Sequence, residues 1–128
     1  MTALTEMGQR AKDAAAVLAN VSSEQKNKAL LEAAKALRQS ADTILAANAQ
    51  DLKRGRENGM SEALLDRLMV NPARIDAMAE GLEQIVTLDD PIGEILSMKK
   101  RPNGLMIGQM RVPFGVIGII YESRPNVT

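Results

Sequence analysis

The sequence contains no cysteine and no histidine. The first absence excludes disulfides, cysteine-based metal sites and a cysteine nucleophile within this chain. The second removes the commonest general base and the commonest metal ligand. A chain with neither residue is a poor candidate for a complete nucleophilic enzyme, and we expect it to bind no metal.

Aromatic residues are scarce, and the two that occur, Phe114 and Tyr121, both lie near the C-terminal end. Lys plus Arg and Asp plus Glu each number 16, so the formal net charge is zero. This balance argues against a nucleic-acid binder or a polybasic membrane binder. No apolar run approaches ~18 residues, and the N-terminus lacks the apolar core of a signal peptide. We therefore expect a soluble, cytoplasmic protein.

The charges are nevertheless unevenly distributed along the sequence. Every charged residue from Asp76 to Glu94 is acidic, whereas every charged residue from Lys99 to Arg111 is basic. A solvated face is our first interpretation of such runs. A contact between the two segments of different molecules is the alternative.

The first ninety residues have the apolar periodicity of α-helices. One stripe at alternating steps of three and four comprises Leu4, Met7, Ala11, Ala14, Leu18 and Val21. A second stripe comprises Leu30, Ala34, Leu37, Ala41 and Ile44. Between them, Ser22 and Gln25 have the spacing of a capping box. We expect both stripes to pack within a domain, and a coiled coil is the alternative that their spacing allows.

Local signals also mark further helix ends. Asn48 is a candidate cap for a new helix, and Asn58-Gly59 predicts a helix end because Gly accepts the left-handed conformation. Ser61 predicts the start of a short helix. Asn71-Pro72 predicts another start, with Asn as the N-cap and Pro at the first helical position. Asp89-Asp90-Pro91 predicts the end of that last helix.

The period of the apolar residues changes after Pro91. Residues 95–112 have the pattern of a β-hairpin, with Arg101-Pro102-Asn103-Gly104 as its turn. Residues Val116–Tyr121 form a continuous apolar run, which is typical of a central strand covered on both faces in a parallel sheet. Helices followed by such strands predict an α/β fold.

A polar cluster, Glu122 to Asn126, follows the apolar run directly. Ligands of open α/β sheets bind beyond the carboxyl ends of the strands, which is the place this cluster would occupy. Arg124 could pair with a phosphate or carboxylate, and the amide of Asn126 could donate to a developing oxyanion. The alternative is a loop whose polar groups bond only to each other and to water.

The last eighteen residues, RVPFGVIGIIYESRPNVT, closely resemble the corresponding stretch of the gamma-glutamyl phosphate reductases. This family, also called the glutamate-5-semialdehyde dehydrogenases, belongs to the aldehyde dehydrogenase superfamily. Residues 46–51 (AANAQD), 58–68 (NGMSEALLDRL) and 90–93 (DPIG) resemble the helical N-terminal region of the same family. Its members are much longer, so the chain resembles their N-terminal portion only.

The resemblance implies the Rossmann-type cofactor domain of a three-domain α/β architecture. Residues 1–128 would be the N-terminal part of the NADP-binding domain. Within it, residues 1–90 would be helical, and residues 94–112 would be the hairpin of the oligomerisation region. Residues 113–128 would be the first sheet strand and the active-site loop.

The resemblance also implies an activity, the NADPH-dependent reduction of gamma-glutamyl phosphate to glutamate 5-semialdehyde and phosphate in proline biosynthesis. The family's nucleophilic cysteine would lie beyond Thr128, so we expect the chain alone to be inactive. Asn126 would be the oxyanion donor, and Arg124 would contact the substrate. The residues beside the nicotinamide cofactor would be Ile119, Ile120, Tyr121, Glu122 and Ser123. A homo-oligomer is expected, and glutamate 5-kinase is a candidate partner.

A non-catalytic alternative is a stand-alone helical module that self-associates through its hairpin. The two hypotheses differ in what the segment 116–121 needs. A free module would leave this apolar strand with an unpaired edge, which independent proteins usually protect with charge or Pro. A third hypothesis is a partly folded chain that associates through this strand.

Overall fold

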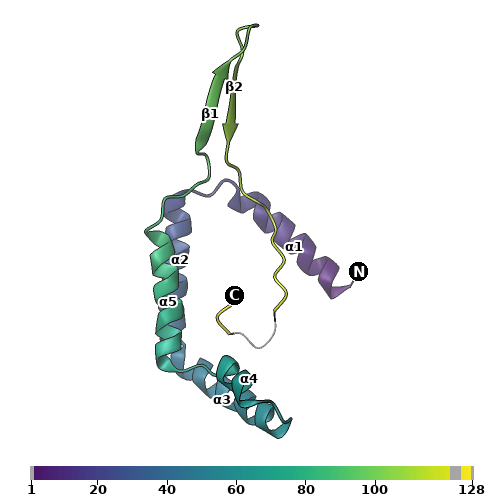
Figure 1. Ribbon diagram of the computed structural model, residues 1–128, viewed down its shortest axis with the longest axis vertical. Helices are drawn as coiled ribbons and strands as arrows, with labels where there is room; N and C mark the ends of the chain where they lie inside the picture. Colours follow the sequence, from purple (N-terminus) through teal and green to yellow (C-terminus); the bar gives the residue numbers. More distant parts are fainter. Residues whose placement is uncertain (1, 122–124, 128) are drawn as a thin grey trace. The chain divides into compact units, whose positions relative to one another are not determined.

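A computed structural model describes residues 2–121 and 125–127 of the chain (Figure 1). Within them lie five helices and one two-stranded antiparallel sheet. The elements are α1 (Ala3–Leu18), α2 (Ser23–Gln39), α3 (Ala41–Glu57), α4 (Glu62–Leu68), α5 (Pro72–Val86), β1 (Ile95–Lys100) and β2 (Met106–Met110). The chain divides into two compact units: Met1–Ser23 with Asp89–Gly118, and Glu24–Leu88 with Ile119–Thr128. The helical region and the hairpin of the predicted α/β class are confirmed.

The starts of the later helices follow the local signals in the sequence. At the start of α5 the side-chain oxygen of Asn71 accepts a hydrogen bond from the backbone N–H of Arg74 at 2.8 Å. Pro72 is the first helical residue, where its missing N–H costs nothing. Helix α4 begins directly after Ser61. Gly59 follows the end of α3 with a φ of 73°, which is the left-handed conformation predicted there.

Helix α1 belongs to the first unit and has no buried residue. It starts at Thr2, whose side-chain oxygen accepts from the backbone N–H of Thr5. Its large apolar side chains, Leu4, Met7, Val17 and Leu18, are all exposed. The predicted stripe is therefore present in the helix but is not covered by the described residues.

The second unit holds a small core. Its buried apolar residues are Ala34 of α2, Leu65 of α4, Val70, and Ile75 and Ala79 of α5. Gly55 of α3 is buried as well, and a Cβ at this position would lie 3.0 Å from Cδ2 of Leu65. The absence of a side chain at Gly55 therefore lets α4 approach α3 closely.

The prediction that Asn48 caps a new helix is wrong. Asn48 lies inside α3, which continues without a break from Ala41 to Glu57. Its side chain is 7% exposed and bonds to the chain beyond α4 instead. The amide nitrogen donates to the carbonyl of Leu68, and the amide oxygen accepts from the N–H of Val70, both at 2.8 Å. These tertiary partners override the capping preference of asparagine.

Helices α2 and α5 lie side by side and are joined by one cation (Figure 1). Nε of Arg38 donates to Asp76 at 2.7 Å, and the other two guanidinium nitrogens donate to the two carboxylate oxygens of Glu83. The hydrogen bond from Arg38 lowers the pKa of Glu83 below its ordinary value of 4.5. The hydrogen bonds that Arg38 donates to Glu83 and Asp76 raise the pKa of Arg38 above its usual value.

The first unit contains the predicted hairpin, with β1 and β2 antiparallel (Figure 1). Its turn is closed by hydrogen bonds from Gly104 N–H to Arg101 O and from Arg101 N–H to Leu105 O. Gly104 has a φ of 88°, as a three-residue loop with a bulge requires. The register shifts between Ile95 and Ser97. Every residue of both strands is exposed.

At the base of the hairpin the acidic and the basic segments of the sequence meet. Nε of Arg111 donates to Glu94 at 2.7 Å, and the backbone N–H of Arg111 donates to the carbonyl of Glu94 at 3.0 Å. This contact is formed within one chain. Asp76 and Glu83, two residues of the acidic segment, likewise form ion pairs within the same chain, with Arg38.

The third predicted strand, Val116–Tyr121, is not formed. Residues 111–121 have no regular secondary structure, and the sheet contains only β1 and β2 in the part of the chain described. A strand exists only when a neighbour completes its hydrogen bonds, and no described segment pairs with this one. Ile117 and Ile119 of this run are 67% and 60% exposed, so its apolar side chains remain uncovered by the described residues.

Candidate functional site

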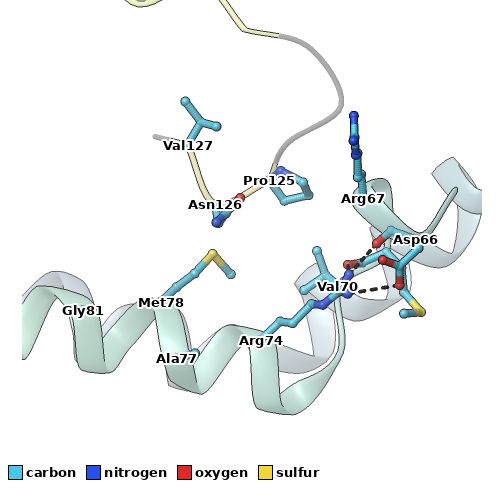
Figure 2. Close-up of a pocket in the computed structure, with 11 residues that line it drawn as sticks. Asp66, Arg67, Val70, Arg74, Ala77, Met78, Gly81, Pro125, Asn126 and Val127 are labelled. Atoms are coloured by element: carbon cyan, nitrogen blue, oxygen red, sulfur yellow. Dashed lines mark hydrogen bonds and ion pairs between the residues drawn. The ribbon is translucent and has the colours of Figure 1, made fainter. Parts of the chain in front are cut away.

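A pocket of about 720 Å³ lies in the second unit and is lined in part by Asn126, the last residue of the polar cluster predicted from the sequence (Figure 2). Three segments line it: the end of α4 (Asp66, Arg67, Met69, Val70), one face of α5 (Arg74, Ala77, Met78, Gly81) and Pro125–Val127. The first two segments are placed by the core contacts of Leu65, Ile75 and Ala79, which are buried. The pocket therefore has a packed helical wall on one side.

Asn126, the predicted oxyanion donor, lines this pocket. Figure 2 shows its side chain next to that of Met78, which extends from α5. Asn126 is exposed and forms no hydrogen bond with the described residues. Its amide N–H₂ is therefore available to a ligand. The structure brings Asn126 together with α4 and α5, which the sequence did not predict.

Arg74 also lines the pocket, but its guanidinium is already engaged (Figure 2). Nη1 donates to the backbone carbonyls of Asp66 at 2.5 Å and Met69 at 2.6 Å, and Nη2 donates to the carboxylate of Asp66 at 3.1 Å. The last carbonyls of a helix have no partner within it, so this guanidinium caps the C-terminal end of α4. Arg74 is therefore a structural residue of the pocket wall.

Arg67 is the second cation of the pocket, and its situation differs. It is exposed, and neither a hydrogen bond nor an ion pair engages its side chain within the described part of the chain. Since Asp66 and Arg74 neutralise each other, Arg67 leaves the lining with one uncompensated positive charge. Arg67 could not be predicted from the sequence, because an Asp-Arg pair in a short helix carries no signal of a site.

A second, mostly apolar pocket of about 420 Å³ adjoins the first. Val70 and Pro125 line both pockets. Asn48 lines the second pocket and bonds to the backbone N–H of Val70. The hydrogen bonds of Asn48 therefore hold the wall that the two pockets share.

The predicted cofactor residues are placed only in part. Ile119 and Ile120 are exposed, and neither lines the two pockets. Tyr121 lines the second pocket. Glu122, Ser123 and Arg124 lie outside the described residues. Ile119 and Ile120 lie outside regular secondary structure, and their role beside a nicotinamide stays a prediction.

Two other kinds of feature are absent from the described ranges, 2–121 and 125–127. No group of three or more acidic, histidine or cysteine side chains there could hold a metal ion. Along the same residues, no helix combines the length and the apolar character that crossing a membrane requires.

Comparison with known proteins gives strong matches, although no protein-family model matches the chain. The gamma-glutamyl phosphate reductase of Heliobacterium modesticaldum is 60% identical over 125 residues, which cover 98% of this chain and 30% of the relative. That of Moorella thermoacetica is 58% identical over 121 residues, which cover 94% of this chain and 29% of the relative.

A solved structure agrees with these relatives. The crystal structure of gamma-glutamyl phosphate reductase from Thermotoga maritima matches with a TM-score of 0.95 at 44% identity, covering 98% of this chain and 30% of that one. This match supports the α/β class of the fold. The chain thus spans about 30% of the length of the relatives it matches. With such identity over nearly its whole length, the chain belongs to the gamma-glutamyl phosphate reductase family, as an N-terminal portion of such a protein.

Proposed function

We propose that this chain supplies the oxyanion-binding wall of an NADPH-dependent gamma-glutamyl phosphate reductase of proline biosynthesis. In the overall reaction the bond between the acyl carbon and phosphate breaks, and a C–H bond forms at that carbon. The acyl phosphate accepts a hydride from NADPH at the acyl carbon, the leaving phosphate takes up one proton, and the products are glutamate 5-semialdehyde, hydrogen phosphate and oxidised cofactor. The observation that supports this proposal best is the unbonded amide of Asn126 on the wall of an open pocket.

In such a reaction Asn126 would stabilise the negative charge that develops on the carbonyl oxygen. Attack on the acyl carbon and the later reduction both place negative charge on the carbonyl oxygen. An amide N–H that is already in position stabilises that charge and contributes about 10²–10³ in rate. The nucleophile is the family's cysteine, and this chain contains none. We therefore expect the chain alone to be inactive.

The cofactor would be NADPH, which supplies a hydride when bound. Residues 119–123 would lie beside its nicotinamide and contact it largely through their backbone. Ile119 and Ile120 are exposed, so the described residues do not block access to their backbone. Arg124 would contact the substrate or the cofactor. The region 1–128 would then form the N-terminal part of the NADP-binding domain.

The hairpin would contribute to assembly. Ile95, Met98, Met106 and Ile107 are exposed large apolar side chains on it, and such a surface usually marks a contact with another protein. We propose that it joins copies of the reductase in a homo-oligomer, and that the protein works in the cytoplasm. Glutamate 5-kinase, which makes the unstable acyl phosphate, is a candidate transient partner. A purely non-catalytic self-association module is the alternative that the same surface supports.

The experiment that tests the proposal is Asn126→Ala in the longer reductase that contains this chain. We expect kcat to fall about 10²–10³-fold, because one oxyanion donor is lost. Asn27→Ala on α2 is the matched control, because Asn27 lies outside the pocket. In the isolated chain the thermal unfolding of Asn126→Ala should match that of the wild type, since Asn126 forms no hydrogen bond with any described residue. An unchanged kcat would contradict the proposal, and so would a loss of folding that accounts for the lost activity.

A further inference from the structure

Arg67 is the one cation on the pocket wall that no acidic side chain among the described residues neutralises. The guanidinium of Arg74, on the same wall, donates hydrogen bonds to two backbone carbonyls and to the carboxylate of Asp66. The side chain of Arg67 forms no hydrogen bond or ion pair with a described residue. Counted over the described lining residues, the pocket therefore carries a net positive charge at the end of α4. A guanidinium presents paired N–H donors that match the two oxygens of a carboxylate. This wall is suited to an anionic group.

Another part of the wall is suited to an aliphatic chain. Val70, Ala77 and Met78 present apolar surface to the pocket. Gly81 follows Ala77 one helical turn later, and a Cβ there would meet nothing within 4 Å in the described residues. A helical glycine costs stability relative to alanine, and packing within the chain does not require it here. Its missing side chain leaves space along α5 for a ligand.

The placement of Asn126 relative to Arg67 sets the shape of that ligand. In Figure 2 the two side chains lie on opposite sides of Pro125, and both border the pocket. A ligand whose acyl oxygen meets Asn126 would carry its phosphate on the same acyl carbon, close to Asn126. An anion at Arg67 would then belong to the far end of an aliphatic chain.

We propose that Arg67 is a specificity-determining residue that binds the carboxylate of the amino-acid head group of the substrate. The inference rests on the proposed function, because it takes Asn126 as the site of the acyl group. Arg67 touches neither the acyl carbon nor the leaving phosphate. Its contribution is to the affinity for substrates that carry a carboxylate at the far end of the chain.

The test is the reverse reaction of the longer reductase, in which an aldehyde, phosphate and oxidised cofactor give the acyl phosphate and NADPH. Two aldehydes are compared: glutamate 5-semialdehyde, which has the carboxylate, and pentanal, which has none. For Arg67→Gln we expect the KM for the semialdehyde to rise about 10-fold or more, with kcat within twofold of the wild type. The kcat/KM for pentanal should not change. Arg67→Lys should retain part of the affinity, because it keeps the charge but loses the paired donors.

Arg56→Gln is the matched control, because Arg56 is exposed on α3 and lies outside both pockets. The inference is overturned if Arg67→Gln leaves the semialdehyde KM unchanged or affects both aldehydes equally. A rise in the KM for inorganic phosphate alone would also overturn it, because the anion at Arg67 would then be phosphate. If the wild-type protein itself fails to turn over the semialdehyde, the proposed function fails, and that result is separate from a failure of Arg67 alone.

Discussion

The side-chain oxygen of Asn48 accepts a hydrogen bond from the backbone N–H of Val70, at 2.8 Å and away from solvent. The same amide donates to the carbonyl of Leu68, so both halves of one side chain are satisfied by a segment twenty residues further along the chain. This segment carries α4 into α5 and forms part of the pocket wall. One buried asparagine therefore fixes the geometry of the site from outside it.

Replacing Asn48 by Ala should destabilise the second unit by about 1–3 kcal/mol. The buried N–H of Val70 would lose its acceptor, and an unsatisfied buried donor costs about that much. Asn48→Asp should also destabilise near neutral pH, because a carboxylate faces the carbonyl of Leu68 with no proton to donate. Urea unfolding followed by circular dichroism at 222 nm measures the effect. Asn27→Ala serves as the control. If Asn48→Ala changed the free energy of unfolding as little as Asn27→Ala does, the role of Asn48 in holding Val70 would be contradicted.

Arg74→Lys should destabilise the chain more than Asp66→Asn does. Nη1 of Arg74 donates to the carbonyls of Asp66 and Met69 while Nη2 donates to the carboxylate of Asp66, and the single ammonium of lysine, on a shorter side chain, cannot take both places. We expect a loss of about 1–2 kcal/mol for Arg74→Lys. The Asp66 carboxylate is mostly exposed, so removing its ion pair should cost well under 1 kcal/mol. Thermal unfolding of the two variants compares them, and the reverse order would argue against the capping role.

Two helical glycines should respond to alanine in opposite ways. Gly81→Ala should stabilise the chain by up to about 1 kcal/mol, because its Cβ would meet nothing within 4 Å. Gly55→Ala should destabilise by about 1 kcal/mol, since its Cβ would lie 3.0 Å from Leu65 Cδ2 and 3.4 Å from Met60 Sδ in the core. Paired urea titrations measure both. A gain in stability from both substitutions would mean that the contact between α3 and α4 is looser than described.

The pair of Arg38 and Glu83 should make part of the stability depend on pH. The pKa of Glu83 is lowered in the folded state, so its contribution is complete above pH 4.5 and is lost as the pH falls through the folded-state pKa. We expect Glu83→Gln to lower the melting temperature at pH 7 but to differ less from the wild type at pH 3. Because Glu83 is at the surface, the change should be modest. Glu80→Gln on the same helix is the control and should not change the pH dependence.

The helix starts and turns that depend on residues adjacent in sequence were predicted most accurately. The start of α5 at Asn71-Pro72 and the turn at Arg101–Gly104 are both set by a few adjacent residues, and both were correct. Asn48 was predicted wrongly because its partners, Leu68 and Val70, are distant in sequence. A capping preference cannot indicate such a tertiary contact.

The apolar run 116–121 shows a second limit of sequence patterns. Its composition is that of a buried strand, yet a strand also needs a partner, and no described segment provides one. At the site, Asn126 was proposed as an oxyanion donor from its position after the apolar run and from the resemblance of its motif, and this role stays a prediction. Arg67 was not, because its importance depends on the absence of a partner, and only the three-dimensional structure shows that.

The exposure of α1 and of the hairpin has a thermodynamic consequence. Unfolding changes the heat capacity and the response to denaturant in proportion to the surface that becomes newly hydrated. Neither α1 nor the two strands contains a buried residue, so their unfolding hydrates little new apolar surface. A calorimetric or urea transition of this chain would therefore report almost entirely on the second unit. Its heat-capacity change and m-value should be those of a protein clearly shorter than 128 residues.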